Sequence, residues 1–160
     1  MTLSRLADIM VRRWVIMKLL FICRDGLEDS LLSTVAMATE ARKTSDGDEV
    51  GILFTGEAVA ALAGQSFDWS PLLRDWGTRM LVSRNATEMG YPLANPRDIR
   101  WTKPRQLLPA AREAGVRLIA CPLWSKLLGV EDKLPEELER PDMAALIQEL
   151  RQSDKVIGSF

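Results

Sequence analysis

A chain of 160 residues with 47% hydrophobic side chains is long enough to bury one core of ordinary size, which argues against a disordered protein. Its net charge of −1 does not supply the basic face that nucleic-acid binding usually needs, so no nucleic-acid partner is expected. The absence of histidine from the sequence excludes a Ser-His-Asp triad, a Cys-His dyad and a typical zinc site. Two cysteines are too few for a disulfide-rich secreted scaffold, which favours a reducing, cytoplasmic location.

Residues 1–16 are expected to form a helical extension to a single domain that spans 17–160. Apolar residues at helical spacing predict a helix over 3–14, either as an appendage or as a subunit contact; they are Leu3, Leu6, Ala7, Met10 and Trp14. The run that follows resembles a signal peptide only loosely, because Lys18 interrupts it and no cleavage site follows. No window is long and apolar enough to span a membrane, so no membrane partner is expected.

The next segments alternate between strand and helix patterns. The continuous apolar run "MKLLFIC" (17–23) is typical of a strand covered on both faces, and a helix is predicted from there to about Lys43. "VGILFT" (50–55) predicts a second strand, and "GEAVAALAG" predicts a short helix that ends at Gly64. This order indicates a parallel sheet with helices on its faces.

The second half continues this pattern less clearly. A helix is predicted to begin near Pro71, and 79–82 is predicted to be a strand. A faint similarity between "WGTRMLVSRNATEMGY" and "AGVRLIACPLWSKLLGV", in which Ser83 matches Cys121, supports this strand. The remainder to 103 is rich in turn residues. Beyond it we predict a helix ending at Gly115, a strand over 116–121, helices over 122–129 and 141–152, and a final strand over 155–160.

Cys121 is the candidate catalytic residue, because it ends a predicted strand and Pro122 then begins a helix. Ligands of open parallel sheets gather beyond the carboxyl ends of the strands. A sulfur exposed there, near the helix N-cap, would face free amides and the positive end of the dipole, which favours the thiolate. Lys126, one turn into the helix, would add positive charge if it folded back. The alternative is that Cys121 only packs.

Three further features could support a site at the same edge of the sheet. Cys23 ends the first strand, and Arg24 would favour its thiolate, although a buried strand-end residue is the alternative. Whether the two sulfurs meet depends on the order of the strands. Thr55, as the helix N-cap, and Gly56 form a turn that could bind an anion or simply cap the helix.

The remaining features have plainer interpretations. Asp25, Glu28 and Asp29 form either a carboxylate site or a solvated first helical turn. The tryptophans indicate core or subunit packing rather than a cofactor site; they are Trp69, Trp76, Trp101 and Trp124. Since the sequence contains no P-loop and no G-x-G-x-x-G motif, no cofactor is predicted.

Three quoted segments resemble the DsrE/DsrF-like family of bacterial sulfur-relay proteins, which includes DsrE/TusD-type members. They are "MKLLFICRDG", "VGILFTGEAVAAL" and "AGVRLIACPLWSKLLGV", and "SDKVIGSF" suits the family's final strand. The resemblance implies a three-layer α/β/α sandwich with a roughly five-stranded parallel sheet, assembled as a trimer or hexamer. It also implies that Cys121 carries sulfur as a persulfide, whereas Cys23 has no counterpart. The long segment 65–103 and the N-terminal helix depart from compact members.

These observations favour a sulfur carrier or sulfurtransferase that takes sulfur from a donor protein and passes it to an acceptor protein. One alternative is a thiol redox protein of peroxiredoxin-like type, in which Cys23 resolves an oxidised Cys121. Another is a non-catalytic subunit that binds a small ligand or serves assembly.

Overall fold

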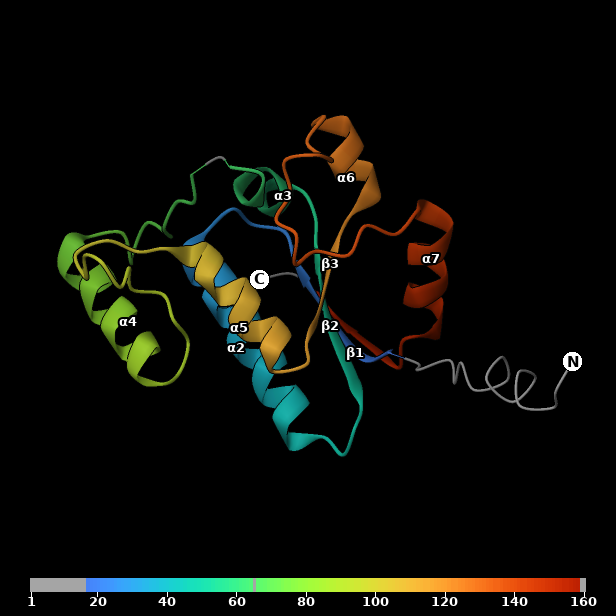
Figure 1. Cartoon of the computed structure of the whole chain (residues 1–160), viewed down its shortest axis with the longest axis horizontal. Helices are drawn as coiled ribbons and strands as arrows, with labels where there is room; N and C mark the ends of the chain where they lie inside the picture. The colour runs from blue at the N-terminus through green and yellow to red at the C-terminus, as the bar shows by residue number, and fades with distance from the viewer. Residues whose placement is uncertain (1–16, 65, 159–160) are drawn as a thin grey trace, which may run out of the picture.

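The computed structural model describes residues 17–64 and 66–158, which form one parallel sheet and the helices that flank it (Figure 1). The strands are β1 (Met17–Cys23), β2 (Glu49–Phe54), β3 (Arg117–Ala120) and β4 (Lys155–Ile157), in the spatial order β3-β2-β1-β4. The helices are α2 (Glu28–Thr44), α3 (Glu57–Leu62), α4 (Trp76–Glu88), a 3₁₀ turn η1 (Pro104–Gln106), α5 (Leu107–Glu113), α6 (Pro122–Leu127) and α7 (Met143–Gln152).

The strand order explains where the helices lie. The chain steps in one direction across the sheet from β1 to β2 to β3, and then returns past both to β4. Crossovers between parallel strands are right-handed, so α2 and α5 share one side of the sheet and α7 takes the other. Figure 1 shows this arrangement, with α2 and α5 side by side and α7 across the sheet from them.

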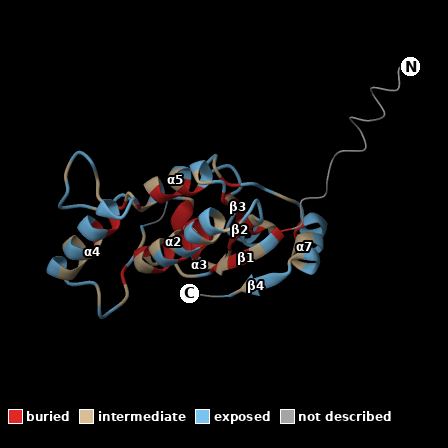
Figure 2. Ribbon diagram, turned by 90° about the horizontal axis from the view of Figure 1, so that it is seen from below, coloured by how far each residue is buried: buried red, intermediate tan, exposed pale blue. Residues whose placement is uncertain are grey.

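The core is centred on β2, which pairs with both β1 and β3. Residues 50–54 of β2 are all buried, as the red strands at the centre of Figure 2 show. The register aligns Cys23 with Phe54 and Phe54 with Ala120, so the three strands end level with one another. The carboxyl ends of these strands therefore meet at a common edge, as the sequence predicts.

The two outer strands of the sheet differ in what covers them. Beyond β3, the backbone of Glu139 forms a single parallel bridge, in which its amide donates to Leu118 (2.7 Å) and its carbonyl accepts from Ala120 (2.9 Å). On the opposite side, β4 is three residues long, and its first two residues are exposed. Four strands are present among the described residues, rather than about five.

The predicted strand at 79–82 is wrong, because these residues belong to α4. The Asp75 side chain accepts a hydrogen bond from the Thr78 amide (3.0 Å) and caps the helix, while residues 71–73, predicted to begin a helix, form a turn. Only Ser83 and Ala86 of α4 are buried. Residues 79–82 form about one turn of a mostly exposed helix, so their apolar side chains point in several directions and none is buried.

Most other elements agree with their predictions. β1, β2 and β3, the helix that ends at Gly115, and the start of α6 at Pro122 are confirmed, as is the final strand over 155–157. The predicted helix over 3–14 and the extension 1–16 lie outside the described residues. Within the described ranges, none of the helices has both the length and the apolarity that a bilayer crossing requires.

Candidate functional site

Three turns follow the carboxyl ends of β1, β2 and β3 and are tied together by main-chain hydrogen bonds. The Thr55 amide donates to the carbonyl of Cys23 (3.0 Å), and the Cys121 amide donates to the carbonyl of Phe54 (2.9 Å). These bonds continue the sheet pairing by one residue beyond the strands. The predicted site residues of all three turns therefore do lie at one edge of the sheet.

Cys121 is the N-cap of α6 as predicted, but its thiol is less accessible than expected. The residue is 8% exposed, and its side chain accepts no capping hydrogen bond from the described part of the chain. Its carbonyl accepts from the Ser125 amide (3.0 Å) and the Ser125 hydroxyl (2.8 Å). The expectation of an exposed sulfur held by helix amides is therefore wrong in both respects: burial is the main feature of this thiol.

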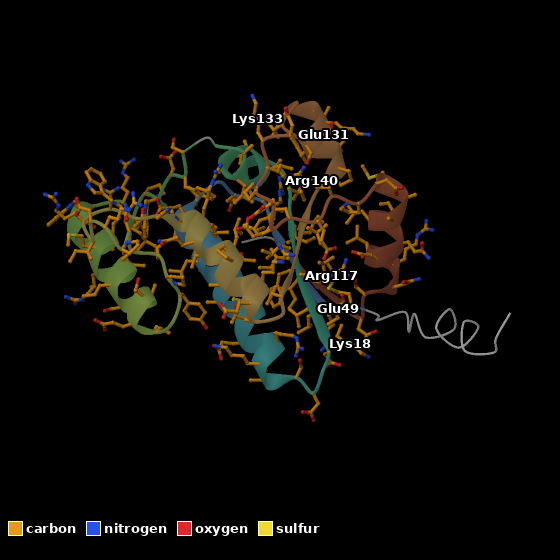
Figure 3. All side chains as sticks on the ribbon, in the orientation of Figure 1. Lys18, Glu49, Arg117, Glu131, Lys133 and Arg140 are labelled. Carbon is orange, nitrogen blue, oxygen red and sulfur yellow. The ribbon has the colours of Figure 1, made fainter. Side chains whose placement is uncertain are left out.

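A pocket of about 230 Å³ lies beside the β3–α6 junction, between α6 and the segment 131–142, although Cys121 itself does not line it. Ala120 and Pro122, the neighbours of Cys121 in the chain, line it together with the exposed side chain of Lys126. Arg140 and Glu131 line the other side, and both are labelled in Figure 3. The pocket thus presents cationic and anionic groups beside the β3–α6 junction.

Arg140 and Glu131 were not identified from the sequence. They belong to the charged run "EDKLPEELERPD", which has no clear periodicity and suggests only a solvated loop. The Arg140 guanidinium donates to the Leu134 carbonyl (2.9 Å), which holds this loop in a compact form. Only the folded loop brings these residues to the pocket, so local sequence carried no signal for them.

Cys23 is fully buried at the end of β1. Burial raises the pKa of its thiol to about 11. The thiol donates a long, weak hydrogen bond to the Asp25 carbonyl (4.0 Å). Arg24 was expected to favour the thiolate, but its side chain is exposed and it does not contribute to this pKa. Cys23 is therefore a neutral core thiol, as its alternative interpretation proposed.

The strand order also separates the two cysteines. Since β2 lies between β1 and β3, the ends of their strands are two inter-strand spacings apart, or about 10 Å. A disulfide needs Cα atoms closer than about 7 Å, and both cysteines are free. A direct Cys23–Cys121 disulfide would require the backbone to move.

The turn after β2 is organised as a helix cap. Gly56, not Thr55, is the N-cap of α3, and its φ of 56° lies in the region that favours glycine. The Ala58 amide donates to the Arg24 carbonyl (2.9 Å), and the Val59 amide donates to the Gly56 carbonyl (3.2 Å). Because these amides are already bonded, plain capping explains the turn better than anion binding.

The acidic residues at the start of α2 attach the segment 66–103 to the sheet domain. Glu28 accepts a hydrogen bond from the Thr102 hydroxyl (2.8 Å), and Asp29 accepts one from the Ser70 amide (2.9 Å). They are neither a free carboxylate site nor a fully solvated turn. The described residues contain no group of three cysteine or acidic side chains placed to hold a metal ion.

The tryptophans divide between core and surface. Trp69 is buried, whereas Trp76 and Trp101 are about 60% exposed (60% and 63%) and Trp124 is 39% exposed. Core packing is thus confirmed for one of the four, and the other three present aromatic surface.

Four parallel strands with helices on both sides define a parallel α/β protein whose candidate site lies at the carboxyl edge of the sheet. No family model and no curated protein matches the chain. Among solved structures, it is similar to a conserved protein of unknown function, BT1422 from Bacteroides thetaiotaomicron, with a TM-score of 0.56 and 14% identity over 89% of this chain and 94% of that one. It is also similar to the ychN protein from E. coli, with a TM-score of 0.54 and 18% identity over 90% of this chain and 100% of that one. At these identities the likeness shows the fold alone.

Proposed function

We propose that this chain is a DsrE-like sulfur carrier in which Cys121 accepts a sulfur atom as a persulfide. The observation that carries the proposal is the position of Cys121, at the N-cap of α6 and beside a pocket that contains Lys126 and Arg140. The sequence resemblance adds support at the same residue. A DsrE-like assignment also implies the three-layer sandwich, with which helices on both sides of the sheet are compatible.

The proposed step transfers one sulfur atom. The Cys121 thiolate attacks the outer sulfur of a donor persulfide, the donor's S–S bond breaks, and the donor leaves as a thiolate. The new S–S bond lies on Cys121, and a thiolate on the acceptor later removes the outer sulfur in the same way. No external oxidant or reductant is needed, because the transferred sulfur keeps its oxidation state.

The residues around Cys121 would serve this step by charge and by exclusion of water. Lys126 and Arg140 would place positive charge in the pocket beside the β3–α6 junction, while Pro122 begins α6 without needing a hydrogen bond at its nitrogen. The low exposure of Cys121 would protect a persulfide from water and small oxidants.

The test is intact-mass measurement after incubation with glutathione persulfide and removal of the excess reagent. Wild type and Cys23→Ser should each gain the mass of one sulfur atom, and Cys121→Ser should gain none. Cys23→Ser is the matched control, since it removes the other thiol. Equal addition to Cys121→Ser, or no addition to wild type, contradicts the proposal.

A non-catalytic subunit is the second candidate, and the 8% exposure of Cys121 favours it. It predicts that Cys121 reacts with iodoacetamide no faster than a free thiol peptide does. A faster reaction would favour the sulfur carrier. The redox alternative loses its simplest form because of the separation between the two cysteines.

Assembly as a trimer or hexamer also belongs to this proposal. The exposed aromatic side chains Trp76, Trp101 and Trp124 are compatible with subunit contacts. Light scattering coupled to size-exclusion chromatography measures the assembly directly, and a monomer over the micromolar range would contradict it.

A further inference from the structure

An apolar groove runs along α4, on the part of the chain furthest from the sheet in Figure 1. It has a volume of about 620 Å³ and lies between α4 and residues 94–99, with Met80, Leu81 and Ile99 on its walls. This volume lies in the range of small-molecule sites, roughly 300–1,000 Å³. We call it the α4 groove.

A small polar recess adjoins the α4 groove. The recess measures about 30 Å³ and shares Trp76, Met80 and Ile99 with the groove. Its other walls include Arg79, Ser83 and Thr102. The recess has room for about two water-sized groups, so it can hold the head of a ligand whose body lies in the groove.

The recess contains buried polar atoms that lack a partner. Ser83 is 2% exposed, and neither its hydroxyl oxygen nor Nε of Arg79 forms a hydrogen bond within the described ranges. Buried polar groups of native proteins are normally satisfied, by protein or by a bound molecule. An oxygen atom in the recess would supply what both of these donors lack.

The charges around the recess favour an anionic oxygen. Arg79 lines the recess, whereas Arg84 and Glu88 both line the groove, so the net positive charge lies at the recess. The Arg100 guanidinium there is already paired with Asp98 (2.8 Å). The buried acid Glu28 accepts from the hydroxyl of Thr102, a residue that lines the recess (2.8 Å). Burial raises the pKa of Glu28, and this outweighs the opposing effect of Thr102 and of the Arg79 charge, so the negative charge of Glu28 is disfavoured.

We propose that the α4 groove binds a small apolar acid, with its alkyl or aryl body in the groove and its oxyanion head in the recess against Arg79 and Ser83. A second copy of the chain could cover the apolar walls, but a flat protein surface would leave the recess donors unpaired. Water alone would pair those donors but would leave the groove uncovered. An amphipathic acid meets both requirements.

The first test uses the unmodified full chain and compares three ligands that share the same alkyl body and differ in their head groups. Decanoate, decanol and decylammonium are each titrated against the bound fluorescent probe anilinonaphthalene sulfonate, and displacement of the probe is measured. Decanoate should compete at about tenfold lower concentration than decanol, because charge-assisted hydrogen bonds exceed neutral ones, and decylammonium should compete least well. Equal competition by all three ligands would overturn the proposal.

The second test locates the site with variants. The double substitution Arg79→Gln with Ser83→Ala should remove the roughly tenfold preference for decanoate over decanol, whereas the matched control Arg151→Gln on α7 should keep it. Leu81→Glu should weaken both ligands by about tenfold or more, since it places a charge on the apolar wall. Far-UV circular dichroism confirms that each variant is folded.

Two results would assign the groove otherwise. A preference for decanoate that survives the Arg79/Ser83 double substitution would place the acid elsewhere on the molecule. The groove would instead be an interface with a second copy if wild type is an oligomer without a preference for decanoate and Leu81→Glu dissociates it. Both results are independent of the sulfur-transfer test, because neither involves Cys121.

Discussion

Apolar side chains of similar size are buried in the sheet core but exposed in the segment 66–103. Leu20 and Ile52 in the sheet are completely buried, whereas Leu81 and Met89 on or beside α4 are 49% and 72% exposed. β2 is enclosed by β1, β3 and the flanking helices, while α4 packs along only one side. Hydrophobic residues are therefore buried where the topology supplies neighbours, and a local apolar run does not predict burial by itself.

The polar groups of the two regions differ in a similar way. At the start of β3, the Arg117 guanidinium forms ion pairs with Glu49 (2.9 Å), Glu139 (2.6 Å) and Glu149 (2.7 Å), with Arg117 and Glu49 labelled in Figure 3. Glu139 and Glu149 raise the pKa of Arg117 above its already high value. In the recess beside α4, by contrast, the Arg79 and Ser83 donors have no partner within the described part of the chain.

The largest expected difference in stability between the two regions comes from a leucine-to-alanine substitution made in each. Leu20→Ala should lower the free energy of unfolding by about 3 kcal/mol, because it leaves a cavity in the closed core. Leu81→Ala should lower it by roughly 0.5 kcal/mol, since half of that side chain already contacts solvent. Urea titration of both variants measures the difference, and equal losses would contradict the comparison.

Alkaline pH should destabilise the sheet region through Cys23. Its pKa is raised from 9.0 to about 11, so the stability that its neutral thiol contributes is complete below pH 9.0 and is lost as the pH rises toward 11. The loss amounts to about 3 kcal/mol. Cys23→Ala should flatten the fall in stability between pH 9 and 11, whereas Cys121→Ala should retain it. Identical pH profiles for the two variants would count against a buried neutral thiol.

Removal of the ion-pair centre should have an intermediate effect. Arg117→Met leaves three carboxylates facing one another at the start of β3 and should lower stability by about 2 kcal/mol, a figure reduced for partial exposure. Arg84→Met, on α4 and without an ion pair in the described structure, should change the stability by less than about 0.5 kcal/mol. Thermal unfolding at two salt concentrations should show a salt-dependent loss only at Arg117.

The smallest effect is expected at the start of α4. Asp75→Ala removes the side chain that accepts from the Thr78 amide and should cost about 1 kcal/mol of helix stability. Amide hydrogen exchange should accelerate in the first turn of α4 and stay unchanged in β2. Acceleration across the whole chain would mean that α4 and the sheet unfold as one unit.

The elements that the sequence predicts well are those in which one local signal dominates. The continuous apolar runs of β1 and β2 have no helical interpretation at that length, and Gly115 ends α5 with a φ of 90° that few other residues adopt. For α4, the apolar run at 79–82 indicates a strand, whereas in the structure Asp75 caps a helix that includes this run. An N-cap residue depends on local geometry and not on distant neighbours, and the sequence analysis did not use this signal.

The candidate site was predictable in position but not in environment. A cysteine followed by proline at the end of a strand locates the N-cap of α6 from chemistry alone. The 8% exposure of Cys121 depends on its tertiary neighbours, as does the arrival of Arg140 at the adjacent pocket. Tertiary burial and loop folding are long-range properties, and a single sequence contains no periodic pattern that reports them.

The unequal borders of the sheet restrict how this protein could associate through its backbone. The Glu139 bridge occupies two hydrogen-bonding groups of β3, the Leu118 carbonyl and the Ala120 amide, that would otherwise be open to an incoming strand. Among the described strands, that leaves β4 as the border at which another chain could add, and the charged Lys155 on this short strand opposes such addition. Edge-to-edge pairing of sheets into fibres is therefore disfavoured at both borders. The Glu139 bridge covers β3, and β4 is short and carries a charge.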